Sequence, residues 1–176
     1  MKYSITTDSV LSRYANRIAY LSDGQVKQVF SRALNHEGDK GRTQVKRSLV
    51  TVTGIKYSLI DRALSTKRAN RNSLEYRLDF DGEETNLNLF KARQTKKGVS
   101  AAPWNVRRIF SHTFMIGAFG GKVYRRVGAP RFPIKAVYGP NLAREVIKGE
   151  PAAAWRIVGP GLADRIGHEI SRFLKS

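Results

Sequence analysis

One apolar stripe with helical spacing, between residues 22 and 53, constrains the fold of this chain more than any other feature. Ser22 and Gln25 have the spacing of a capping box, which predicts that a helix begins there. Thr53-Gly54 predicts its end, because glycine readily adopts the left-handed backbone conformation that terminates many helices. The residues that would share the apolar face are Val26, Phe30, Ala33, Leu34, Val45, Leu49 and Val52.

Two glycines inside this segment favour a different interpretation. Gly38 and Gly41 would each cost about 1 kcal/mol relative to alanine in a helix interior. Two short helices joined at residues 37–41 are therefore the alternative. We favour one long helix, because the apolar stripe keeps its phase across the glycines.

The opposite side of the same segment is basic. On a helical wheel the cations gather at Arg32, Lys40, Arg42, Lys46 and Arg47. Such a face is typical of non-specific contact with DNA phosphates, although a plain solvated face is the commoner role of a charge cluster.

The hydrophobic period changes after this helical region. Residues 8–21 and 57–65 have helical spacing, with Thr7 or Asp8 as a cap for the first. From Leu74 to Phe80 apolar and polar residues alternate, which predicts a half-buried strand. Further extended segments are expected at 87–89, at 99–101, on both sides of a Gly120-Gly121 turn, and at 133–138 before Gly139-Pro140.

Helices followed by strands predict an α+β fold. It would have N-terminal helices including one long basic amphipathic helix, a mostly antiparallel β-sheet, and C-terminal helices. We divide the chain into an α+β domain at 1–148 and a helical extension at 149–176. A short helix is expected at 141–148, another would open with Pro151 at its first position, and a last one would follow Gly159-Pro160-Gly161. The extension is either a docking arm or a set of helices that pack on the domain.

The net charge is strongly positive. Lys and Arg number 32 against 14 Asp and Glu, a formal net charge of +18, and the excess lies in residues 1–138. Such a surplus favours polyanions or acidic protein surfaces as partners. The chain has no cysteine, which excludes disulfides and thiolate sites. Its N-terminus lacks the apolar region of a signal peptide, and no apolar run reaches the roughly 18 residues of a membrane span, so we expect no membrane contact.

Groups that could support catalysis are scattered. The three histidines, His36, His112 and His168, belong to no metal motif, and a carboxylate one helical turn from His168, Asp164, does not by itself make a metal site. Residues 117–122 fail the spacing of a phosphate-binding loop. The carboxylates at Asp79, Asp81, Glu83 and Glu84 alternate with core residues or lie in a turn, which indicates a solvated face or a subunit contact. We expect no enzyme, no cofactor and no metal.

Several stretches together resemble the minor tail protein Z family of long-tailed phages and prophages, also called tail completion proteins. They are 32–35 with 43–49 and the Thr53-Gly54 stop, then 89–94 with Gly98-Val99, then 123–126. The most specific is the string Pro133-Ile134-Lys135-Ala136-Val137-Tyr138-Gly139-Pro140. The resemblance covers residues 10–148 in the expected order and excludes the rest of the chain.

This resemblance implies a structural protein of the virion tail, assembled in the host cytoplasm, that acts at the head-proximal end. It would complete the tail and enable head–tail joining as a subunit of a ring, a hexamer by resemblance. Its partners would be its own copies, the tail terminator, the tape measure or tail tube proteins, and the DNA end. The expected subunit interface comprises Arg125, Arg126, Pro133, Ile134, Lys135, Tyr138, Leu162, Ile166 and Phe173.

Two alternatives stay open. The chain could be a non-specific nucleic-acid-binding module unrelated to virions, since its basic excess suits phosphate contact. A nuclease is the more remote alternative, because it would need metal-dependent cleavage through Asp79 or Glu83.

Overall fold

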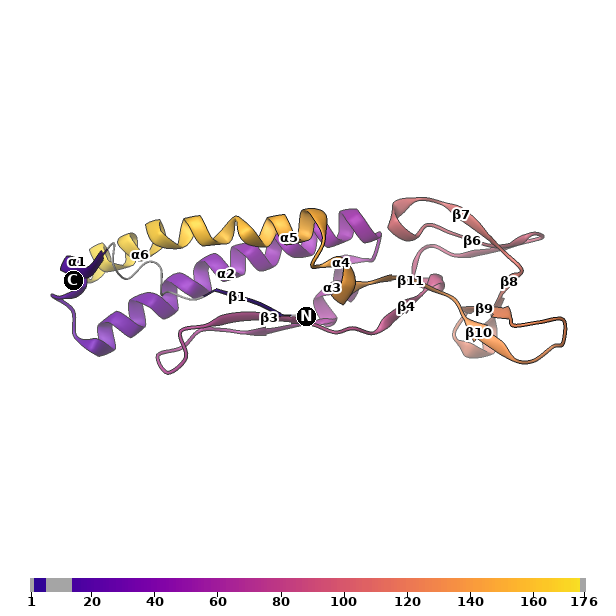
Figure 1. Cartoon of the computed structure of the whole chain (residues 1–176), viewed down its shortest axis with the longest axis horizontal. Coiled ribbons are helices and arrows are strands. Elements are labelled where there is room, and N and C mark those ends of the chain that lie inside the picture. Colours follow the sequence, from indigo (N-terminus) through magenta and orange to yellow (C-terminus); the bar gives the residue numbers. More distant parts are fainter. Residues whose placement is uncertain (1, 6–13, 175–176) are drawn as a thin grey trace.

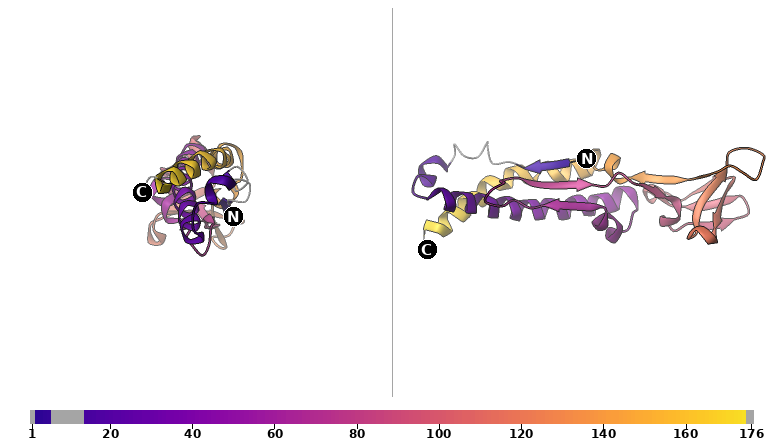
Figure 2. Two further views of the ribbon diagram at one scale, coloured as in Figure 1. Left: turned by 90° about the vertical axis from the view of Figure 1, so that its left-hand side faces the viewer. Right: turned by 90° about the horizontal axis from the view of Figure 1, so that it is seen from below.

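The computed structural model describes residues 2–5 and 14–174, and these form an elongated molecule with two parts (Figures 1 and 2). At one end, long helices and a three-stranded sheet form the body. At the other end, residues 91–136 form two small sheets that we call the β-lobe. The fold is α+β, as predicted, and every strand pairing of the described residues is antiparallel.

One helix forms the axis of the body. Helix α2 runs unbroken from Asp23 to Thr53, which confirms the long-helix prediction. The capping box is present: the Ser22 hydroxyl accepts from the Gln25 backbone N–H, and the Gln25 side chain accepts from the Ser22 N–H. Gly54, with φ 75°, ends the helix in the left-handed conformation.

The two glycines inside α2 allow neighbouring elements to approach the helix closely. A Cβ atom on Gly38 would lie 2.4 Å from Cγ of Tyr76, and one on Gly41 would lie 2.4 Å from a methyl group of Val158. Their cost in helix propensity is therefore offset by packing that no other residue permits.

The C-terminal helices pack on α2. Helices α5 (Gly149–Arg156) and α6 (Val158–Leu174) run beside it and contribute Trp155, Val158 and Ile170 to the same core (Figure 1). Tyr3 from the N-terminal strand stacks on Trp155, with ring centroids 5.3 Å apart. Through these contacts α5 and α6 pack against α2 and the N-terminal strand.

The prolines of these helices lie inside them. Helix α6 begins at Val158, so the prediction that it follows Gly161 is wrong. Pro151 is the third residue of α5, not the first. Both Pro151 and Pro160 are tolerated because the first turn of a helix needs no intrahelical N–H donor.

The sheet of the body has the order β1-β3-β2, from β1 (Lys2–Ile5), β3 (Tyr76–Phe80) and β2 (Leu64–Lys67). The alternation predicted for β3 is confirmed, since Tyr76, Leu78 and Phe80 are buried. Helix α3 (Tyr57–Arg62) ends earlier than predicted, because Leu64 pairs with Phe80 as the first residue of β2.

The N-terminal helix predicted at 8–21 falls partly on residues 8–13, outside the described residues. Within the described part, α1 spans only Ala15–Ile18. Strand β1 was not predicted, because its alternation of polar and apolar residues covers only four residues, the shortest run that can indicate a strand.

A neck joins the body to the β-lobe. It consists of β4 (Glu84–Asn86) paired with β11 (Tyr138–Asn141), a 3-10 turn η2 (Leu87–Leu89) and the short helix α4 (Leu142–Glu145). The extended segment predicted at 87–89 is wrong, because the Asn86 side chain accepts from the Asn88 N–H and caps a turn there. Gly139 and Pro140 do not end the extended backbone either. They lie inside β11, where Gly139 leaves room for the Phe90 ring.

The β-lobe contains two three-stranded sheets. The first has the order β5-β6-β7, from β5 (Arg93–Thr95), β6 (Gly98–Ala101) and β7 (Arg108–Ser111), with the 3-10 turn η3 (Pro103–Asn105) between the last two. The second has the order β10-β9-β8, from β8 (Thr113–Ile116), β9 (Lys122–Arg126) and β10 (Ile134–Ala136), with η4 (Gly117–Phe119) in its hairpin. The strand at 99–101 and the hairpin that turns at Gly120-Gly121 are confirmed.

Candidate nucleic-acid interface

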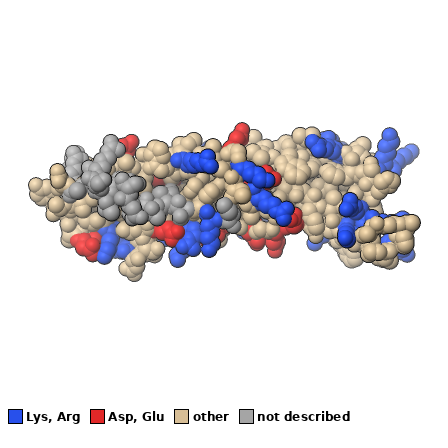
Figure 3. All heavy atoms as spheres, in the orientation of Figure 1, with Lys and Arg blue, Asp and Glu red and all other residues tan. Residues whose placement is uncertain are grey.

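The β-lobe and the neck strand that leaves it carry positive charge only. From Thr85 to Arg144 the sequence has no Asp or Glu. The cations of this stretch are Lys91, Arg93, Lys96, Lys97, Arg107, Arg108, Lys122, Arg125, Arg126, Arg131, Lys135 and Arg144. On the face shown in Figure 3, Lys and Arg spheres occur along the whole molecule, whereas Asp and Glu spheres lie over the body and neck and are absent from the β-lobe end.

Some of these cations line an open groove of about 1240 Å³ in the β-lobe. Its wall contains residues of the β5–β6 turn, the β7–β8 turn, β9 and β10. The basic residues of the wall are Lys96, Lys97, His112, Arg125, Arg126 and Lys135. No carboxylate is among the described residues that line it.

A tight hairpin presents the two lysines. Lys96 and Lys97 form a two-residue turn between Thr95 and Gly98, which are paired across β5 and β6. The Thr95 hydroxyl donates to the Gly98 carbonyl over 2.7 Å and holds the turn closed. A Cβ atom at Gly98 would lie 2.1 Å from the Phe110 carbonyl oxygen, so only glycine lets β6 approach β7 here.

A single residue connects the two sheets. His112, with φ 57°, lies alone between β7 and β8. The next residue bonds two strands of the first sheet, β6 and β7: the Thr113 hydroxyl donates to the Phe110 carbonyl (2.5 Å) and accepts from the Val99 N–H (3.0 Å). Gln94 adds a further link, since its Oε1 accepts from the Met115 N–H over 3.0 Å. These bonds fix one sheet against the other and so fix the shape of the groove.

Two of the groove cations face each other across neighbouring strands. Arg125 of β9 is paired directly with Lys135 of β10, and on its other side with Thr113 of β8. Directly opposed residues of an antiparallel pair project to the same face, where like charges repel. Among the described residues neither cation has a carboxylate within ion-pair distance.

The chemistry available in this groove is electrostatic attraction. Several lysine and arginine side chains that line one groove can bind several anionic groups at once. The groove pairs no nucleophile or general base with an orienting acid, and its wall, as far as the structure describes it, contains no carboxylate to hold a metal. It is suited to a polyanion.

The basic face predicted on α2 is largely neutralised. Lys46 is only 5% exposed, so the prediction that it faces solvent is wrong. Its ammonium lies 2.9 Å from Oδ1 of Asp61 and 4.6 Å from the Tyr57 ring centroid. Arg42 bonds the same carboxylate over 2.6 Å. Asp61 and Tyr57 both belong to α3. A helical wheel of α2 contains no information about a second helix that packs against it.

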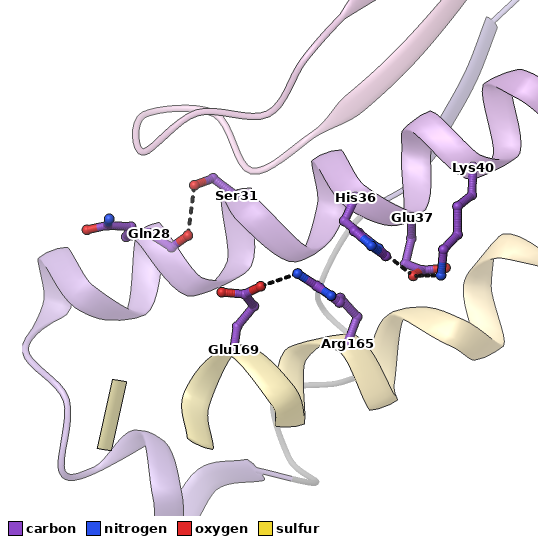
Figure 4. A network of polar contacts seen from close by, with 7 residues as sticks. All are labelled: Gln28, Ser31, His36, Glu37, Lys40, Arg165 and Glu169. Carbon is purple, nitrogen blue, oxygen red and sulfur yellow. Dashed lines mark hydrogen bonds and ion pairs between the residues drawn. The ribbon is translucent and has the colours of Figure 1, made fainter. Parts of the chain in front are cut away.

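The other predicted cations of α2 have mixed surroundings. Lys40 bonds the buried carboxylate of Glu37 over 2.7 Å (Figure 4). Arg32 lies over the Phe173 ring of α6, 5.5 Å from its centroid. Arg47 is exposed and has no ion pair within the part of the chain that the structure describes.

The predicted interface residues divide into three groups. Arg125, Arg126 and Lys135 line the groove, and Pro133, Ile134 and Tyr138 lie nearby on the exposed or half-exposed surface of the lobe and neck. Leu162 and Ile166 are buried in the body core, which corrects their assignment to a subunit contact, because α2 already covers them. Phe173 is half-buried beneath Arg32.

Three basic residues of the groove were not predicted from the sequence, namely Lys96, Lys97 and His112. A signal was present, since no Asp or Glu occurs from Thr85 to Arg144. The basic excess taken over 1–138 as a whole does not reveal this stretch, because acidic residues occur before Thr85.

The titratable groups outside the groove are dispersed. His36 bonds Glu37 on α2, while His168 lies on α6. No group of three His, Cys, Asp or Glu that could hold a metal occurs among residues 2–5 and 14–174. No helix of this described part is long and apolar enough to cross a membrane.

Comparison with known proteins gives no match: no family model, no curated protein and no solved structure is significantly similar to the chain.

Proposed function

We propose that the chain is a structural phage-tail subunit that acts at the head-proximal end of the tail, completes it and enables head–tail joining as a member of a ring. It works by binding partners and carries no catalytic site. The partners would be its own copies, the tail terminator, the tape measure or tail tube proteins, and DNA.

One observation carries the proposal: three of the stretches that resemble tail completion proteins, 89–94, 123–126 and 133–140, meet where the β-lobe joins the neck. The Val137 N–H donates to the Val123 carbonyl over 2.9 Å, and the Leu87 N–H donates to the Val137 carbonyl over 3.1 Å. The Phe90 ring fills the space that Gly139 leaves open. Residues that resemble a family and also form one packed unit support the resemblance better than isolated strings do.

The shape of the molecule supports a role in assembly. An elongated subunit with a rigid helical body offers separate surfaces at its two ends for different partners (Figure 2). Strands β5, β7, β8 and β10 are sheet edges, which are suitable for contact between subunits.

The test is an amber mutation of the gene in the phage or prophage that encodes the chain. We expect full heads and free tails that do not join, restored by the wild-type gene in trans, and the chain present in purified tails by mass spectrometry. Normal infectious particles that lack the chain would refute the proposal. Sedimentation of the purified chain tests ring formation independently.

A nucleic-acid-binding module unrelated to virions is the second candidate, and the basic groove favours it. In that case the purified chain would bind nucleic acid as a monomer, and the amber mutation would leave particle assembly unchanged.

A further inference from the structure

We propose that the groove between the two sheets of the β-lobe, and not the basic face of α2, binds the phosphodiester backbone of a nucleic acid. The inference rests on the groove alone and does not depend on a role in a tail.

The first argument concerns which cations already have an anionic partner within the chain. On α2, Arg42 and Lys46 share Asp61, and Lys40 bonds Glu37, so these cations already have anionic partners within the chain. In the groove, five Lys and Arg side chains converge with no carboxylate among the described lining residues. Their mutual repulsion is unfavourable in the free protein, and a bound polyanion would relieve it.

The second argument is the arrangement. Lys96 and Lys97 project from a hairpin tip of one sheet, while Arg125 and Lys135 lie on adjacent strands of the other. The bonds of Gln94 and Thr113 hold these two walls in place. A linear ligand with a charge on every repeat can contact both walls, whereas one small anion contacts only a few of the cations. Successive phosphates provide that repeat.

The third argument concerns specificity. Asn and Gln side chains commonly read base edges, and Gln94 lines the groove. Its amide is already occupied, however: the nitrogen donates to the Thr95 carbonyl (3.1 Å), and the oxygen accepts from the Met115 N–H. Phosphate contacts position a protein without reading sequence. We therefore expect binding that depends on salt but not on base sequence.

The experiment uses the full chain and fluorescence anisotropy with labelled duplex DNA and single-stranded DNA of equal length. The groove variant carries Lys96→Gln, Lys97→Gln, Arg125→Gln and Arg126→Gln. The matched control removes the same charge from exposed positions of the body, with Arg47→Gln, Lys56→Gln, Lys67→Gln and Lys148→Gln. Thermal melts by circular dichroism establish that both variants fold.

We expect the groove variant to bind roughly 100-fold more weakly at fixed salt. The slope of log affinity against log salt should become shallower by about one for each phosphate that the variant no longer binds. The control should stay within about threefold of the wild type, as expected for charges that do not touch the ligand. Comparison of duplex and single strand identifies which nucleic acid the groove prefers.

Equal weakening in both variants would overturn the proposal, because net charge alone would then explain binding. So would undiminished binding by the groove variant, or displacement of DNA by polyglutamate at equal charge concentration, which would indicate an acidic protein as the ligand. If the quadruple variant does not fold, the Lys96→Gln/Lys97→Gln pair at the exposed hairpin tip provides the same test, with Arg47→Gln/Lys56→Gln as its control. Anisotropy does not measure particle assembly, so failure of the tail role and failure of this proposal are distinguishable.

Discussion

Arg125 and Lys135 lie directly opposite each other on β9 and β10, a pairing of like charges that the β-lobe leaves without a carboxylate among its described residues. Opposed like charges destabilise an antiparallel pair, whereas opposite charges stabilise it by roughly 0.2–1 kcal/mol. The pairing therefore lowers the stability of the strand pair and concentrates positive charge in the groove.

The substitution Lys135→Glu should raise the stability of the lobe and weaken nucleic-acid binding at the same time. The new carboxylate would pair with Arg125 and would also repel phosphates. Thermal unfolding and DNA titration of the same sample measure the two effects. A lower melting temperature together with unchanged DNA affinity would contradict the role given to this pair.

The substitution Gly38→Ala should destabilise the body, because its Cβ atom would lie 2.4–2.5 Å from three atoms of the Tyr76 ring. Overpacking of this kind costs about 1–3 kcal/mol. The control is Gly24→Ala in the same helix, where no atom lies within 4 Å. That change should stabilise the helix by up to about 1 kcal/mol. Urea denaturation of both variants gives the comparison, and equal shifts in the same direction would contradict it.

The substitution Asp61→Asn should destabilise the junction of α2 and α3, since it leaves the buried Lys46 ammonium without its carboxylate. The hydrogen bond from Lys46, and then its charge, lower the pKa of Asp61, which is consistent with a stabilising pair. The double variant Lys46→Met/Asp61→Asn should recover most of the decrease in melting temperature, because it removes the buried charge. No recovery would show that Asp61 acts mainly through Arg42.

The body should lose stability in acid through Glu37, which is buried beside His36 and Lys40 (Figure 4). Burial is the largest single influence and opposes ionisation, but the hydrogen bonds and charges of Lys40 and His36 outweigh it, so the pKa of Glu37 lies below its usual value. Its contribution is thus fully present above about pH 4.5 and disappears as the pH falls through the lower folded pKa.

Melting curves between about pH 7 and pH 3 for the wild type and Glu37→Gln test this. The wild type should exceed the variant most at neutral pH, and the two should converge in acid. A constant difference would mean that the charge of Glu37 is not involved.

Asn86 should control how firmly the lobe is attached to the neck. Its buried side-chain amide pairs with the backbone of Val123 as a residue of a neighbouring strand would. Oδ1 accepts from the Val123 N–H (2.8 Å), and Nδ2 donates to the Val123 carbonyl (3.2 Å). In Asn86→Ala the carbonyl keeps its bond from the Val137 N–H, but the buried Val123 N–H is left without this acceptor, at about 1–3 kcal/mol. Hydrogen exchange should accelerate in β8 and β9 and stay slow in α2, whereas uniform acceleration would mean that lobe and body unfold together.

Local patterns were sufficient to predict the long helix, because its start, its end and its apolar stripe all depend on residues that are close together in the sequence. Ser22, Gln25 and Gly54 needed no distant partner to act as caps. The same holds for β3, whose alternation is set by one buried face. Where the prediction failed, at Leu64 or at Gly139-Pro140, a distant strand or ring decided the conformation.

The α+β class, the unbroken helix at Asp23–Thr53 and the stretch without acidic residues can all be read from the order of the residues, since periodicity, caps and charge are local properties. Which cations remain available to a partner depends instead on the tertiary fold. Lys46 is buried by Asp61 and Tyr57 of a different helix, while Lys96, Arg125 and Lys135 converge on one groove from three separate strands and turns of the lobe. The availability of a charge depends on where its counter-charge lies in space, and spacing along the chain does not contain that information.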